Sequence, residues 1–359
     1  MPMLSPNLSK ELSKKLSNKL SSKLSTIFSA CSVFKRNPLS ETLLGIDFGC
    51  ERINAVALRA LPAIADQPTA YQLQAMASVA TPSGAIVDHQ LHNMAQVVDA
   101  LKQLRRMLKV PTRNVATAVS GSSVTTKIVH VPNSLPVEML AHHMEQEAAA
   151  HIPFPLAEIS LDFEILGPSE LHPDRDKILL SAARTEHVQA RVDALRQVGW
   201  RAQVVDIGSH ALARAVCFLL APPPEQRVAV LELSAESLTF MVISQGEIIY
   251  QRLQPLAADS EPATLSNQHY MAQVTSQAQR QLQLFCSNSG QTSPLQLLLC
   301  GSDTDLAQLV PRLSHTLGIA VQLPDFSVMF GGEPHHYSEA PAFSTALGLA
   351  LRRSSPCLI

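Results

Sequence analysis

Residues 115–132 read VATAVSGSSVTTKIVHVP, residues 142–168 read HHMEQEAAAHIPFPLAEISLDFEILGP, and residues 177–206 read KILLSAARTEHVQARVDALRQVGWRAQVVD. Their apolar pattern predicts, in order, a strand, a helix, two strands, a helix and a strand. We interpret this order as one compact module of about 90 residues. Its position in the middle of the chain indicates an insertion, which we place at 115–205.

Helix and strand boundaries inside this stretch follow from proline, glycine and capping residues. Ser134 is expected to cap the first helix, which has Pro136 in its first turn and ends at Ile152 before a proline. Gly199 is expected to close the second helix, 186–198. The two strands between the helices are predicted at 159–166 and 177–183.

The flanking sequence supplies further elements on both sides of the module. Residues 41–58 predict two strands joined by a tight glycine-containing turn, and 88–108 predict an amphipathic helix. After the triple proline at 222–224, three short strands form a predicted meander. A helix at 271–286, a strand at 295–301 and a helix at 305–317 are predicted to follow.

Composition restricts the class of protein. The 359 residues suffice for two lobes with a core each, and 46% apolar against 16% charged residues excludes a disordered chain. The net charge of −2 is uneven, because the first 38 residues carry +6 and the remainder therefore −8. An acidic body without a basic, aromatic stripe argues against nucleic acid as a partner. Since no apolar window is long enough, no membrane span is expected.

The first 38 residues form a low-complexity arm in which leucine recurs every four positions from Leu4 to Leu24. A four-residue step advances about 40° around a helix, so the leucine stripe winds away from any one face. The arm is either a basic amphipathic helix that makes peripheral contact with an anionic membrane or with a partner, or a solvated tail.

Two more stretches extend the pattern to both ends, LLGIDFG at 43–49 and APAFSTALGLALRR at 340–353. Together with AHIPFPLAEISLDF at 150–163, they resemble the PilM family of bacterial type IV pilus assembly proteins, which is related to FtsA. The resemblance implies an α/β, two-lobed actin-like ATPase fold with a shortened upper part of the second lobe. The implied segments are the arm 1–38, the first lobe 39–114 and 206–226, the inserted FtsA/PilM-type subdomain 115–205, the second lobe 227–353 and a tail 354–359.

The resemblance also implies a nucleotide cleft whose first phosphate turn reads D-I-G-S-x-x-V-K in the family. Here Asp47 and Gly49 are kept, with Phe48 between them, and Asp47 is the expected magnesium residue. The hydroxyl of the family has become Cys50, and the lysine has become Asn54. Glu51 adds negative charge next to the expected phosphates, which Arg52 can offset.

The second turn and the adenosine motif depart further from the family. Glu232, Ser234 and Ala235 stand where relatives have D-I-G-A, and Gly301 is followed by Ser302 instead of a second glycine. Two interpretations stay open. Either the cleft binds ATP and Mg²⁺ through Asp47 and backbone amides, or it is a relic with weak turnover at most.

In PilM relatives, a groove between the first lobe and the inserted subdomain binds the N-terminal cytoplasmic tail of the inner-membrane protein PilN. The resemblance implies such a groove here, with Val124, Ile128 and Val131 as candidate contacts. It predicts a cytoplasmic adaptor at the inner membrane for fimbrium biogenesis and twitching motility, with other pilus inner-membrane components as partners. The alternatives are an active actin-like ATPase and an FtsA-like division scaffold.

Overall fold

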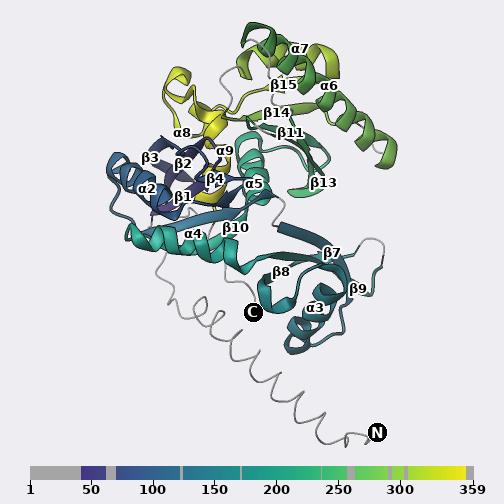
Figure 1. The fold of residues 1–359 in the computed structure, drawn as a ribbon. Coiled ribbons are helices and arrows are strands. Elements are labelled where there is room, and N and C mark those ends of the chain that lie inside the picture. The colour runs from purple at the N-terminus through teal and green to yellow at the C-terminus, as the bar shows by residue number, and fades with distance from the viewer. Residues whose placement is uncertain are drawn as a thin grey trace, which may run out of the picture. The chain divides into compact units, whose positions relative to one another are not determined.

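The described part of the chain contains two five-stranded sheets, one three-stranded sheet and one two-stranded hairpin (Figure 1). We describe it from a computed structural model, which covers residues 42–61, 70–121, 124–169, 172–235, 237–256, 263–289, 293–302 and 306–352. The expected arm 1–38 and tail 354–359 lie outside these residues. No helix of the covered part is long and apolar enough to cross a membrane.

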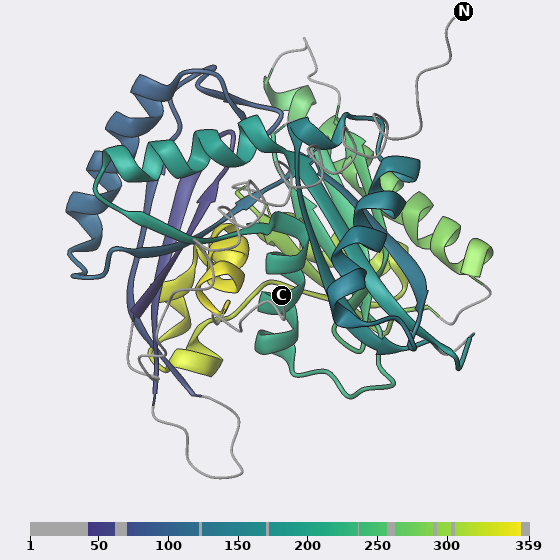
Figure 2. The ribbon, with the colours of Figure 1, turned by 90° about the horizontal axis from the view of Figure 1, so that it is seen from below.

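The first sheet has the strand order β10-β6-β1-β2-β3. Its strands are β1 (Thr42–Phe48), β2 (Arg52–Ala60), β3 (Tyr71–Ala80), β6 (Asn114–Val119) and β10 (Arg201–Ile207). Helices α2 (Met94–Leu108) and α4 (Thr185–Gln197) cover one face through a core that includes Leu44, Leu101 and Leu195. Helices α5 (Gly208–Leu220) and α9 (Ser344–Ala350) lie on the other side of the purple strands (Figure 2).

The second sheet has the order β13-β12-β11-β14-β15. Its strands are β11 (Val228–Leu233), β12 (Ser237–Ser244), β13 (Glu247–Pro255), β14 (Gln296–Gly301) and β15 (Ala320–Gln322). Helices α6 (Ala263–Ser289) and α7 (Leu306–Leu317) pack on one face. Helix α5 packs on the other face through Leu212 and Val216, so this helix joins the cores of both lobes.

Helices α5 and α9 cross at a very short distance. A Cβ atom added at Gly348 would lie 1.7 Å from the carbonyl oxygen of Ala211, so only glycine allows this crossing. The two helices are therefore closely packed against each other, and α5 contacts both sheets.

The third sheet, β7-β9-β8, is separate from the other two. It comprises β7 (Val124–Pro132), β8 (Ile159–Pro168) and β9 (Arg175–Arg184), and α3 (Val137–His151) covers one face around Met144. The predicted insertion 115–205 is wider than this sheet, because β6 and β10 pair within the first sheet and α4 packs on its core. We call β7, α3, β8 and β9 the small subdomain.

Some element boundaries differ from the sequence prediction. The helix expected at 88–108 begins only at Met94, because β4 (Ile86–Val87) and β5 (Gln90–Leu91) form a hairpin whose turn residues Asp88 and His89 have positive φ. Ser134 does not cap α3, since the N-cap position is Pro136 without a side-chain hydrogen bond. Helix α6 is longer than the predicted 271–286.

The remaining short elements lie before β8 and before α9. They are η2 (Leu156–Glu158) before β8, and α8 (Ser327–Phe330), η3 (Pro334–Tyr337) and η4 (Ala340–Phe343) before α9. The expected strand-turn-strand units at the start of each lobe are confirmed by the antiparallel pairs β1–β2 and β11–β12.

Candidate nucleotide cleft and partner surface

Gly49 builds the turn that the sequence comparison predicts to be the first phosphate turn. Its backbone N–H donates to the Arg52 carbonyl oxygen at 3.1 Å. A Cβ atom at Gly49 would lie 2.6 Å from that oxygen, so the turn requires a glycine here. The family's glycine is therefore kept for a geometric reason that holds whether or not a phosphate binds.

The second turn is closed by serine in place of glycine. The Ser234 backbone N–H donates to the Ser237 carbonyl at 2.9 Å, and the Ser234 hydroxyl accepts from the Ser237 N–H at 3.2 Å. The same hydroxyl lies 2.9 Å from the Ser237 hydroxyl. Ala235 lies exposed at the tip of this turn. Because the Ser234 hydroxyl also donates to the Ser237 carbonyl oxygen at 3.2 Å, it is not a free donor for a phosphate.

Two carboxyl groups, Asp47 at the end of β1 and Glu232 near the end of β11, lie near enough for the charge of one to act on the other. Burial raises the pKa of Asp47 to about 6, and the positive charge of Arg191 offsets this in part. Burial also raises the pKa of Glu232 to about 7, and the negative charge of Asp47 adds to that rise. Thr345 on α9 donates to Glu232 at 3.2 Å.

A side-chain hydrogen bond connects the two lobes at the same place. The Ser302 hydroxyl, directly after β14, donates to the Glu51 carboxylate of the first turn. Gly301 has φ +129°, and a Cβ atom there would lie 2.0 Å from the Leu233 carbonyl oxygen. The close approach of β14 to β11 is therefore enough to require this glycine, without an adenosine.

Four of the predicted nucleotide residues direct their side chains elsewhere. Phe48 is 2% exposed in the core of the first lobe, and Cys50 packs against the same core. The Arg52 Nε donates to the Ser78 hydroxyl on β3 at 2.7 Å. Asn54 is 4% exposed, donates to the Ala342 carbonyl at 2.9 Å and accepts from Ser78 at 2.6 Å. The residue in the family's lysine position thus holds β2, β3 and η4 together.

One charged residue near the turn was not predicted from the sequence. Arg191 on α4 is 1% exposed, donates to the carbonyl oxygens of His187 at 3.0 Å and of His89, and lies 5.9 Å from the Phe48 ring centroid. Burial lowers its pKa to about 10. The sequence signal was available, because Arg191 stands four positions before the buried Leu195, on the apolar face of its helix.

The donor set of the cleft suits a cation better than a triphosphate. The Asp47 and Glu232 carboxylates are ligands of the kind that Mg²⁺ prefers. A phosphate would meet these two acids and Glu51, while Arg52 and Arg191 are bonded to protein acceptors. Within the described ranges, no group of three or more His, Cys, Asp or Glu could hold a metal ion by itself.

The predicted partner residues occupy different environments on β7. Ile128 is 41% exposed and lies opposite Leu179 of β9, on the face of the small subdomain that α3 does not cover. Val124 is half-buried on the same face, opposite Ala183. Val131 is 2% exposed and packs in the core beneath α3. Ile128 is thus the one of the three with a well-exposed side chain.

An ion pair connects the face of the small subdomain that α3 does not cover to the second lobe. Lys177 on β9 bonds to Glu247 on β13 at 2.5 Å, so the outer face of the small subdomain approaches the edge strand of the second lobe. Figure 1 shows β13 and the small subdomain on the same side of α5.

A family profile described as "Type IV pilus assembly protein PilM" matches residues 45–268, well over half of the chain. The chain belongs to the PilM family. Among solved structures, a "PilM-PilN type IV pilus biogenesis complex" matches with a TM-score of 0.72 and 24% identity, covering 89% of this chain and 100% of that chain. The two-lobed actin-like fold implied by the sequence is thereby confirmed.

More distant structures share less of the geometry with this PilM-family chain. The ethanolamine utilization protein EutJ from Carboxydothermus hydrogenoformans matches with a TM-score of 0.45 and 15% identity, over 89% of this chain and 92% of its own. A Bacteroides thetaiotaomicron protein with an actin-like ATPase fold and unknown function matches with a TM-score of 0.46 and 10% identity, over 88% and 97% of the two chains.

Proposed function

We propose that this protein is an adaptor of the type IV pilus machine that binds the N-terminal cytoplasmic tail of a PilN-like inner-membrane protein. Family membership and the similarity to a PilM–PilN complex support the role. The proposed site rests on one observation. On the face of the small subdomain that α3 does not cover, exposed Ile128 lies opposite Leu179. An extended or helical tail with apolar side chains fits such a surface.

The partner determines where the adaptor acts. A tail that emerges from the inner membrane places the protein in the cytoplasm, at the cytoplasmic face of that membrane. Other inner-membrane components of the pilus, and twitching motility as the process served, follow from the same role.

The cleft in this proposal is a structural relic with weak nucleotide turnover at most. Asn54 in the lysine position is bonded to Ser78 and Ala342, and Ser234 is bonded within its own turn. The bond between Glu51 and Ser302 connects the lobes through protein atoms alone. These contacts support a body that keeps the actin-like shape to present its partner surface.

A titration of a synthetic PilN tail peptide from the same organism tests the site. We expect a Kd in the micromolar range or tighter for the full chain, and a loss of at least about tenfold for Ile128→Asp. Val328 is the matched control, because it is 74% exposed on α8, which packs next to β3 of the first lobe. Val328→Asp should bind like the parent protein, and equal losses in both variants would contradict the assignment.

A second function, an active actin-like ATPase, is favoured by one observation. The pKa values of Asp47 and Glu232 lie near neutral pH, as expected for carboxyl groups placed to hold a metal ion or accept a proton. The test is magnesium-ATP turnover, which Asp47→Asn must abolish if this function is correct.

A further inference from the structure

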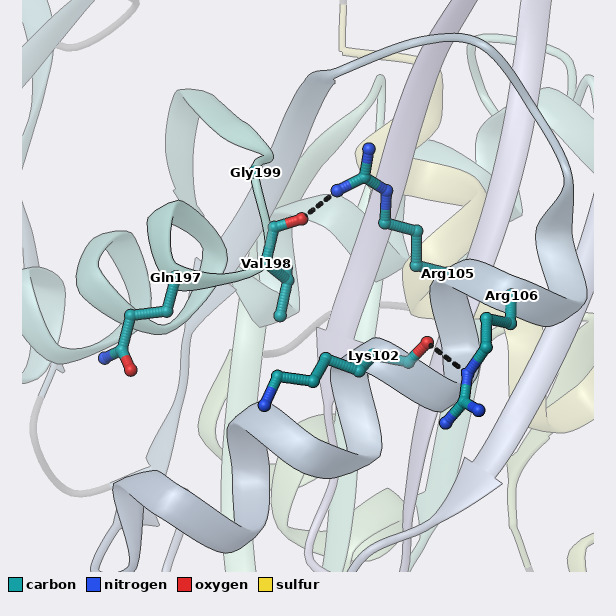
Figure 3. A pocket seen from close by; sticks show the side chains of 6 residues that line it. All are labelled: Lys102, Arg105, Arg106, Gln197, Val198 and Gly199. Carbon is teal, nitrogen blue, oxygen red and sulfur yellow. Dashed lines mark hydrogen bonds between the residues drawn. The ribbon is translucent and has the colours of Figure 1, made fainter.

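A cluster of basic residues lies at one end of the first lobe, where α2 and α4 end and β6 and β10 begin. We call it the basic end; it consists of seven exposed residues, Lys102, Arg105, Arg106, Lys109, Arg113, Arg196 and Arg201. Figure 3 shows Lys102, Arg105 and Arg106 from α2 around a shallow pocket that Gln197, Val198 and Gly199 close from the end of α4. The basic end is therefore continuous across two helices and two strands.

Specific contacts fix this arrangement. The Arg105 guanidinium donates to the Val198 carbonyl at the end of α4, and a Cβ atom at Gly199 would lie 2.8 Å from Arg105. The Arg201 backbone N–H donates to the Arg113 carbonyl at 2.7 Å. These contacts hold the end of α2 next to the end of α4, and the start of β10 next to Arg113.

The basic end has few acidic neighbours. Asp99 pairs with Lys102 at 2.8 Å, and Asp193 pairs with Arg196 at 2.7 Å. Seven basic against two acidic residues give a formal charge of +5, within a body whose charge outside the first 38 residues is −8. Such segregation of charge creates a local positive potential that the net charge of the protein hides.

The stabilising effect of cations at the ends of α2 and α4 explains only part of the basic end. Arg105 and Arg106 lie in the last turn of α2, and Arg196 lies in the last turn of α4, where cations offset the helix dipole. Lys109 is the C-cap residue of α2 and has the same effect, but Arg113 and Arg201 lie beyond the helix ends, next to the start of β6 and at the start of β10. Their charge is free to act on a partner.

We propose that the basic end binds an anionic membrane surface through the phosphates of lipid headgroups. The inference rests on the proposed function in one respect, that a PilN-like partner holds the protein near the cytoplasmic leaflet. Juxtamembrane cations gain energy from that leaflet without any apolar contact, and arginine pairs well with phosphate.

An acidic protein is the less suitable partner. Protein interfaces concentrate their energy in buried apolar or aromatic anchors. The large exposed apolar residue on this part of the chain, Met107, lines a different groove along β3 together with Tyr337 and Phe343. The basic end thus offers charge over a broad surface, which suits a lipid surface.

Cosedimentation of the full chain with vesicles tests the proposal. The vesicles contain phosphatidylcholine and phosphatidylglycerol in equal parts, or phosphatidylcholine alone. We expect binding to the anionic vesicles only, and a decrease of at least about 30-fold in the partition coefficient for Arg106→Glu/Arg113→Glu. The matched control is Arg280→Glu/Arg312→Glu, which changes the charge equally on exposed positions of α6 and α7; it should bind within about threefold of the parent.

Three outcomes would overturn the proposal. If both double variants bind the anionic vesicles equally well, the basic end does not contact the membrane. Binding that is lost only when Lys14, Lys15, Lys19 and Lys23 become glutamine assigns the contact to the N-terminal arm. The third outcome is that the parent protein binds a soluble polyglutamate peptide but no vesicles, and that Arg106→Glu/Arg113→Glu loses the peptide binding. This result would assign the basic end to an acidic protein partner.

The test also separates this inference from the proposed function. Titration of the PilN tail peptide into Arg106→Glu/Arg113→Glu should give the affinity of the parent, which also shows that the variant is folded. If no protein binds the peptide, the adaptor role fails while the vesicle result is still interpretable.

Discussion

Glu51 and Ser302 are hydrogen-bonded although 251 positions separate them in the sequence. Glu51 belongs to the first phosphate turn and Ser302 follows the strand that would carry the adenosine motif. Ser302 stands where relatives have a second glycine, whereas Glu51 occupies a position that the family pattern leaves open. The cleft therefore contains a side-chain contact between the lobes at the place where a nucleotide would bridge them.

Removal of this contact should loosen the connection between the lobes. We predict that Ser302→Ala lowers the free energy of unfolding by about 1 kcal/mol, since one partly exposed hydrogen bond is lost. Hydrogen exchange should accelerate in residues 47–51 and 296–301. Ser287→Ala, which removes an exposed hydroxyl bonded within α6, is the control; equal exchange in both variants would show that the contact has no mechanical role.

The two raised carboxyl pKa values predict a pH dependence of stability. The ordinary pKa values are 3.8 for Asp47 and 4.5 for Glu232, and the folded values are about 6 and about 7. The folded state therefore binds these protons more tightly than the unfolded chain. The free energy of unfolding should fall as the pH rises from about 4 to about 7, and then level off.

Glu232→Gln provides the direct test of that dependence. The variant keeps an acceptor for Thr345 and removes the buried charge, so it should be more stable than the parent by roughly 1–2 kcal/mol at pH 8. The gain should vanish near pH 4.5, and urea unfolding at several pH values measures both limits. Glu225→Gln at an exposed loop position is the control. A gain that is independent of pH would contradict a titration effect.

Asn54 is predicted to be a structural residue despite its place in the phosphate motif. Asn54→Leu leaves the Ala342 carbonyl and the Ser78 hydroxyl without this partner in a buried place, so it should cost roughly 2–4 kcal/mol. Ser78→Ala removes one bond of Asn54 and also the acceptor of the Arg52 Nε, and it should cost roughly 1–2 kcal/mol. Thermal unfolding measures both, and a stable Asn54→Leu protein would reopen the assignment of Asn54 to the cleft.

These contacts show which parts of the molecule local sequence can predict. The strand-turn-strand units follow from apolar alternation around Gly49, and the small subdomain follows from the order of its elements. The start of α2 was predicted too early, because Asp88 and His89 adopt positive φ in a hairpin that apolar periodicity does not reveal. Local sequence patterns therefore predict the boundaries of these elements to within a few residues.

The chemistry of the cleft depends on tertiary partners and could not be predicted in the same way. Asn54 is bonded to a carbonyl 288 positions away, and Glu232 is bonded to Thr345 113 positions away. A substitution in a motif shows that a family contact has changed. It does not show where the new side chain finds its partner.

Magnesium-ATP binding is the prediction on which the interpretation of the cleft depends. Three carboxylates, Asp47, Glu51 and Glu232, would surround the phosphates, while Arg52 and Arg191 are bonded elsewhere. We therefore expect no calorimetric heat beyond dilution at ATP concentrations up to about 1 mM. Asp47→Asn should behave like the parent protein. Micromolar binding that Asp47→Asn abolishes would instead establish a working cleft, in which a metal ion supplies the positive charge that the side chains do not.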